Sequence, residues 1–174
     1  MNAFLALGPA ETTLLLFFSA LMIAAGIQDA LTMKISNKIS ILLILGFVIY
    51  AGIGSIGPIE VGIRTATMVA IFAILLVLHH NNLMGGGDVK LMAAGSLWFQ
   101  APEPLFLYIG LTSIFGGVVT LALQFMRHTP MPLFVYRWEA FDRWHKNSRY
   151  VPYGIGIAMG AISTQYLLLT PFMR

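Results

Sequence analysis

The chain has 174 residues, of which 58% are hydrophobic and only 10% are charged, whereas an ordinary soluble domain carries about 25% charged residues. This composition excludes a soluble enzyme and indicates an integral membrane protein. The length suits about one compact domain, which we expect to cover residues 1–174. The absence of cysteine excludes disulfides, thiolate catalysis and cysteine-ligated zinc. The net charge of +3 comes from basic residues beside apolar runs, which indicates membrane topology rather than a nucleic-acid site.

Six apolar runs follow one another along the chain. They lack the alternating hydrophobicity of barrel strands and therefore predict helices. We expect an all-α bundle of about six transmembrane helices, although the fourth run is too short to cross a bilayer core of ~30 Å comfortably. The runs are 12–28, 39–56, 62–78, 88–99, 105–126 and 151–173, and the longer polar stretches between them are 29–38, 79–87 and 127–149.

Lysine and arginine are distributed unevenly among the connecting stretches. Counted over the segments 29–38, 79–90 and 127–149, these stretches hold eight of the ten basic residues. Basic loops stay in the cytoplasm, so these three segments should be cytoplasmic and both chain termini should lie outside. The stretch 127–149 also has aromatic residues at near-helical spacing, which predicts an amphipathic helix on the cytoplasmic surface of the membrane. The cytoplasmic basic residues are then Lys34, Lys38, Lys90, Arg127, Arg137, Arg143, Lys146 and Arg149, against Arg64 and Arg174 on the other side.

The stretch Gly85-Gly86-Gly87-Asp88-Val89-Lys90 sets a carboxylate between apolar runs, where an ionisable group is a functional-site hypothesis by default. The first apolar helix should reach the cytoplasmic face at Asp29, and the fourth should leave that face at Asp88. We therefore expect both carboxyl groups at the same depth in the membrane. The simpler interpretations are that Asp88 is an ordinary N-cap residue and that Asp29 is a juxtamembrane residue without a function.

Two carboxyl groups that share a water molecule cannot both ionise easily, so one stays protonated and the other ionised. Such a pair can hydrolyse a peptide bond without a metal or a covalent intermediate, because the ionised member takes a proton from water and the protonated member donates one to the substrate. The glycines lack Cβ and allow a substrate backbone to approach closely. The alternative from another class is a small transporter or channel component that uses the same carboxyl groups for proton or cation transfer.

At these residues the chain resembles the type IV prepilin peptidases, which are membrane aspartic proteases of the GxGD class, and most of all their short members that serve tight-adherence (Flp-type) pili. Gly85 to Leu91 is similar to the family's G-x-G-D-x-K-L block. Asp29 and the following Lys34-Ile35-Ser36-Asn37 are similar to the family's first aspartate and its basic-Ile-Pro-Asn element, with Ser36 where proline is usual. Val151-Pro152-Tyr153-Gly154-Ile155-Gly156 is similar to the Pro-aromatic-Gly start of the last helix.

This resemblance implies an aspartic endopeptidase that cuts the short basic leader from prepilins or pseudopilins at the cytoplasmic face of the bacterial inner membrane. It implies no metal or cofactor, and no N-methyltransferase activity because the chain lacks the paired Cys-x-x-Cys domain of longer members. The expected partners are the precursor, the lipid bilayer and the pilus assembly machinery, with no nucleic acid. A presenilin-like protease is a weaker alternative, because Gln28 stands where those enzymes carry tyrosine. The implied catalytic residues are Asp29 and Asp88, and the implied substrate-binding or loop-shaping residues are Gly85, Gly86, Gly87, Lys90, Lys34 and Asn37.

Overall fold

The computed structural model describes residues 8–53, 56–100, 102–128 and 151–169. Within these ranges every regular element is a helix, which confirms the predicted all-α fold class. The amphipathic helix expected within 127–149 lies, from residue 129 on, outside the described residues. The helices are α1 (Pro9–Thr32), α2 (Asn37–Gly52), α3 (Pro58–His80), α4 (Gly86–Ser96), α5 (Glu103–His128) and α7 (Tyr153–Leu169).

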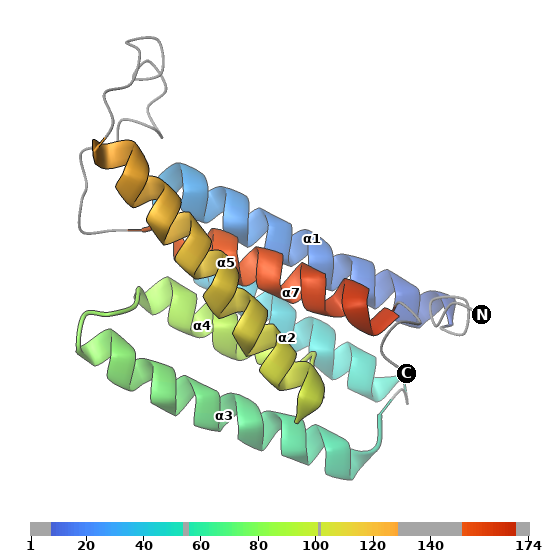
Figure 1. The fold of residues 1–174 in the computed structure, drawn as a ribbon. Helices are drawn as coiled ribbons and strands as arrows, with labels where there is room; N and C mark the ends of the chain where they lie inside the picture. The colour runs from blue at the N-terminus through green and yellow to red at the C-terminus, as the bar shows by residue number, and fades with distance from the viewer. Residues whose placement is uncertain (1–7, 54–55, 101, 129–150, 170–174) are drawn as a thin grey trace.

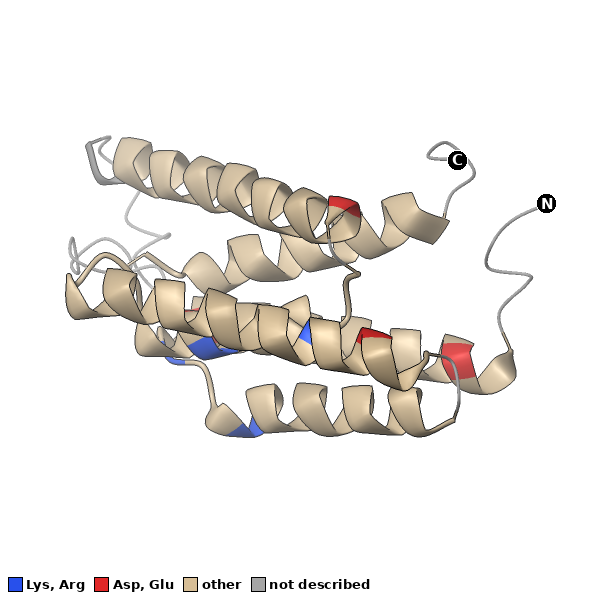
Figure 2. Cartoon of the chain, turned by 90° about the horizontal axis from the view of Figure 1, so that it is seen from below, with Lys and Arg blue, Asp and Glu red and all other residues tan. Residues whose placement is uncertain are grey.

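Three of the helices, α1, α3 and α5, are long and apolar enough to cross a membrane. Two more, α2 with 16 residues and α7 with 17, are apolar but shorter. Charged residues are so sparse that most of the ribbon in Figure 2 is uncoloured tan. The membrane helical bundle predicted from composition is therefore confirmed for the described part of the chain.

Successive helices run in alternating directions (Figure 1). As a result α1, α3 and α5 end on the side of the bundle where α2, α4 and α7 begin, and we call this side the site end. Along the bundle α5 packs on α7, α7 packs on α1, and α1 packs on α2. The short helix α4 contacts α2, α3 and α7, so it occupies the interior.

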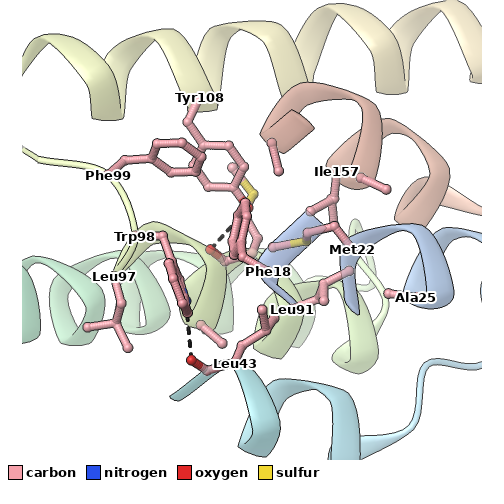
Figure 3. Packing of buried hydrophobic residues seen from close by; sticks show 14 of the residues in the cluster. Phe18, Met22, Ala25, Leu43, Leu91, Leu97, Trp98, Phe99, Tyr108 and Ile157 are labelled. Carbon is pink, nitrogen blue, oxygen red and sulfur yellow. Dashed lines mark hydrogen bonds between the residues drawn. The ribbon is translucent and has the colours of Figure 1, made fainter. Parts of the chain in front are cut away.

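The helix α4 has 11 residues and is buried along most of its length. At about 1.5 Å per residue it is about 16 Å long, roughly half of the hydrocarbon core of a bilayer. Aromatic side chains surround the turn that follows it (Figure 3). The Trp98 ring lies 5.0 Å from the Phe18 ring and donates its Nε1–H to the Leu43 carbonyl at 3.2 Å, while the Tyr108 hydroxyl donates to the Met92 carbonyl at 3.3 Å. These contacts tie the end of α4 to α1, α2 and α5.

The end of α1 differs from the sequence-based expectation. We expected the polar stretch 29–38 to lie outside the helix, but α1 continues to Thr32, so Asp29 lies within its last turn. The helix ends where Met33 adopts a left-handed conformation with φ of 53° and donates its N–H back to the Asp29 carbonyl at 2.8 Å. This extra turn carries Asp29 into the bundle, where its carboxyl group is buried.

Small residues allow α7 to pack closely on α5. The Gly156 backbone lies against Gly116, and the ring of Tyr153 also covers Gly116, so a Cβ at either glycine would clash. Gly160 faces Thr112 just as closely. Close approach of small residues is a common way to pack helices in membranes. Here it fixes the first turn of α7 at the site end.

Candidate active site

Asp29 is held by the start of α7. Its carboxyl group is buried, with the residue only 5% exposed, and its Oδ2 accepts a hydrogen bond of 2.8 Å from the Gly154 N–H. Gly154 is the second residue of α7, and N–H groups in the first turn of a helix have no acceptor within their own helix. A Cβ on Gly154 would lie 2.8 Å from the same oxygen, so this contact requires glycine.

Asp88 is the third residue of α4 and is 8% exposed. The N-cap residue of α4 is Gly85, so the interpretation of Asp88 as an ordinary N-cap is wrong. The carboxyl group folds back toward the cap, and a Cβ on Gly85 would lie 2.6 Å from Asp88 Oδ2. Asp88 Oδ1 is buried and has no hydrogen-bond partner among the described residues. An orphaned buried oxygen of this kind is destabilising by about 1–3 kcal/mol.

The loop between α1 and α2 brings the two aspartates together through Ile35. A Cβ built on Gly87 would lie 3.0 Å from Ile35 Cβ, and one built on Gly154 would lie 2.9 Å from Ile35 Cδ1. Ile35 therefore fills the space between the residue next to Asp88 and the residue bonded to Asp29. The two carboxyl groups are close enough to interact electrostatically. Two aspartates 59 positions apart in the chain thus lie near each other at the site end, with Ile35 packed against the neighbour of one and the hydrogen-bond donor of the other.

Lys90 and Asn37, both expected near the site, contact each other. Lys90 Nζ donates to Asn37 Oδ1 at 2.9 Å, and both side chains are exposed. This bond ties α4, at its fifth residue, to the first residue of α2. Lys34 is exposed in the loop between α1 and α2, where its N–H donates to Thr32 Oγ1 at 3.3 Å. These three residues form an exposed rim at the site end.

The glycine loop is fastened to the end of α3. The sequence predicted that His79 lies in a polar break, whereas α3 continues to His80. The His79 ring nitrogen Nδ1 lies 2.9 Å from the Met84 carbonyl, and a Cβ on Gly86 would lie 3.3 Å from the same ring. His79 therefore supports the backbone that leads into Gly85. Residues 81 and 82 form the turn, with Asn82 in a left-handed conformation of φ 58°.

Four supporting residues, Gln28, Ile35, His79 and Gly154, were not predicted from the sequence as parts of the site. Gln28 Oε1 accepts the Ser36 N–H at 3.0 Å and so holds the loop after α1. Ile35 and His79 pack against the glycine loop from opposite sides of the chain. For Gly154 the sequence offered one signal, because this residue lies within a stretch that resembles the start of the family's last helix. Nothing in the local sequence indicated the contacts made by Gln28 and His79.

Two buried carboxyl groups therefore lie at one end of the membrane helical bundle, and a glycine loop leads directly into the second of them. The sequence profile of the type IV leader peptidase family matches residues 16–121, which include both aspartates. The chain therefore belongs to the type IV leader peptidase family. Comparison with curated proteins and with solved structures gives no match. Within the described ranges, no group of three or more His, Asp or Glu residues is arranged to hold a metal ion.

Proposed function

We propose that this protein is an aspartic endopeptidase of the GxGD class, in which Asp29 and Asp88 activate water to cut a peptide bond. The observation that carries this proposal is the meeting of two buried carboxyl groups from α1 and α4, one of which has an oxygen without a hydrogen-bond partner among the described residues. Two like charges in one buried place destabilise the fold, so their retention favours a chemical role. Membership of a peptidase family favours this enzyme over the transporter alternative.

The proposed substrate is a Flp-type prepilin or pseudopilin with a short basic leader. The leader would stay in the cytoplasm, and the bond that is cut would meet the two aspartates just before the precursor's hydrophobic helix. The exposed lysines Lys34, Lys38 and Lys90 all lie at the site end, which supports a cytoplasmic orientation of that end by the positive-inside rule. The membrane would be the bacterial inner membrane, with both chain termini in the periplasm.

The glycine loop would serve this reaction by letting an extended substrate approach the carboxyl groups. Gly85, Gly86 and Gly87 are not fully buried, whereas Asp88 directly after them is buried. A substrate backbone that lay along the loop would therefore reach the carboxyl groups from the exposed side. Side chains on the loop would block this path, and one at Gly85 would also displace the Asp88 carboxyl group.

The test is co-expression of the protein with a Flp-type prepilin, followed by mass spectrometry of the pilin N-terminus. We expect a single cut at the cytoplasmic edge of the hydrophobic helix in the presence of the wild type. An Asp88→Asn variant that inserts normally should leave the precursor intact. A secreted protein with an ordinary cleavable signal sequence serves as the control substrate and should not be cut by either form.

Two results would contradict the proposal. A cut deep within the hydrophobic helix would favour the presenilin-like alternative, because the reaction would then not occur at the membrane surface. A precursor that remains full length with the wild-type protein, while proton or cation flux is measured in liposomes, would favour a transport function.

A further inference from the structure

The two aspartates differ in what their oxygen atoms contact. Asp29 Oδ2 receives the Gly154 N–H at 2.8 Å from the first turn of α7. The positive end of the helix dipole and a hydrogen bond to an N–H both favour a negative charge on the acceptor. Of the two residues, only Asp88 has a buried oxygen without a hydrogen-bond partner among the described residues. A carboxylate in that position is less stable than a neutral carboxylic acid.

Because the two carboxyl groups interact electrostatically, the difference between their contacts determines which of them keeps a proton. The groups are close enough to affect each other, so ionisation of both is unfavourable and one proton is shared between them. Asp88 also lies at the start of a helix, α4, and its carboxyl group has a hydrogen bond with the Gly85 backbone. Each aspartate therefore has one backbone hydrogen bond, and the two differ in the second oxygen of Asp88, Oδ1, which is buried without a partner among the described residues. The shared proton nevertheless resides on the carboxyl group whose negative charge is stabilised less. This group is Asp88, because its buried Oδ1 has no hydrogen-bond partner within the described ranges.

We propose that Asp29 is the ionised carboxylate that takes a proton from the attacking water, and that Asp88 is the protonated acid that donates to the leaving amine. This assignment rests on the proposed peptidase function. Gly154 then acts as a positioning residue, because its N–H orients the Asp29 carboxylate without touching the substrate. The match to the family covers residues 16–121, so Gly154 lies outside the matched part of the chain.

The proposed steps balance in atoms and protons. The water oxygen forms a bond to the scissile carbonyl carbon while one water proton moves to Asp29. The carbon–nitrogen bond then breaks, and the nitrogen leaves with the proton of Asp88. The products are a free amine and a new carboxyl terminus. Asp29 is now protonated and Asp88 ionised, and transfer of one proton from Asp29 to Asp88 restores the starting state.

An ester substrate distinguishes the two roles. An alkoxide leaves far more easily than an amide nitrogen, so hydrolysis of an ester depends much less on a general acid, but it still needs an activated water. A synthetic precursor peptide with an ester in place of the scissile amide should be cut by Asp88→Asn at a rate above that of Asp29→Asn. We expect the difference to be roughly 10²-fold, the size of one general acid–base contribution.

The outcomes separate this assignment from the function on which it rests. Equal loss of ester hydrolysis in the two variants, or faster hydrolysis by Asp29→Asn, would overturn the assignment. Cleavage of the normal amide peptide at the wild-type rate by either variant would instead contradict the proposed function. Both variants are compared at equal amounts of folded protein, which is measured by thermal unfolding in detergent.

Discussion

Buried charges occur at two places in the bundle, and their surroundings are opposite. Away from the site end, the Arg64 guanidinium donates from Nε to Glu60 Oε1 at 2.8 Å, and its Nη1 lies 3.5 Å from the Trp98 carbonyl at the end of α4. At the site end, two carboxyl groups lie together, and within the described ranges no ion pair joins Asp29 or Asp88 to a cation. A paired charge needs no function beyond holding helices together. Two buried carboxyl groups without a counter-ion destabilise the fold, so their role is to be sought in the reaction.

Substitutions at the two places should therefore affect different properties of the protein. A change at the site end should reduce the reaction more than the stability. A change at the Arg64 pair should reduce the stability more than the reaction.

Among substitutions outside the two aspartates, Gly154→Ala should have the largest effect on the reaction. The new Cβ would lie 2.8 Å from Asp29 Oδ2 and 2.9 Å from Ile35 Cδ1, so the carboxyl group has to move. Displacement of a catalytic group by about 1 Å can lower a rate roughly 10²-fold. The measurement is the cleavage rate of a synthetic precursor peptide by purified protein in lipid nanodiscs.

The matched control is Gly117→Ala in α5, because a Cβ on Gly117 would meet nothing within 4 Å. This variant should keep the wild-type rate. If Gly154→Ala also kept it, the Gly154 contact would be irrelevant to the reaction, and the assignment of roles to the two aspartates would lose its geometric basis.

Arg64→Met should lower the stability and leave the reaction nearly unchanged in the folded protein. Removal of one partner from a buried ion pair is destabilising by about 3–5 kcal/mol. We expect about 2 kcal/mol here, because the Glu60 side chain is 24% exposed and is partly solvated. The measurement is thermal unfolding in detergent, followed by tryptophan fluorescence.

The double variant Glu60→Met with Arg64→Met should recover part of this stability, because no unpaired charge remains. A loss of activity in Arg64→Met at temperatures where the protein is folded would contradict the division between the two places. Equal unfolding temperatures for Arg64→Met and the wild type would show that the pair does not stabilise the bundle.

Lys90→Ala should have the smallest effect on stability, below about 1 kcal/mol, because its bond to Asn37 is exposed to solvent. Its place on the exposed rim, two residues after Asp88, should make the effect on cleavage larger than this, although below tenfold. The measurement is again the peptide cleavage rate, with Lys38→Ala as the control lysine on the same side of the bundle. A stability loss as large as that of Arg64→Met would contradict the view of this rim as a solvated surface.

The fold class and the meeting of the two aspartates could be predicted from the sequence for physical reasons. Apolar runs of this length have few stable forms in a membrane, and alternating helix directions place Asp29 and Asp88 at one end of the bundle. The end of α1 could not be located as well, because Asp29-Ala30-Leu31-Thr32 is polar at its start but compatible with helix, and the left-handed Met33 that ends the helix has no sequence signal.

The supporting contacts were beyond prediction because they depend on packing between distant segments. The Gly154 N–H meets Asp29 across 125 residues, and Ile35 fits between two glycines whose roles are visible only in the folded chain. His79 was assigned to the polar stretch 79–87, whereas α3 continues to His80. Its contact with the glycine loop depends on the direction of the turn at Asn82, which the local sequence does not determine.

The most direct test of the central claim is the single-turnover cleavage rate of a precursor peptide by the purified wild type, Asp29→Asn and Asp88→Asn in nanodiscs. Glu103→Gln, at an exposed carboxylate in the first turn of α5, is the control for loss of a negative charge. Each aspartate variant should be folded and slower by roughly 10³-fold, within the range of general acid–base contributions, while Glu103→Gln should be unaffected. A folded Asp29→Asn or Asp88→Asn variant that cuts within tenfold of the wild-type rate would show that its carboxyl group is not needed for the reaction.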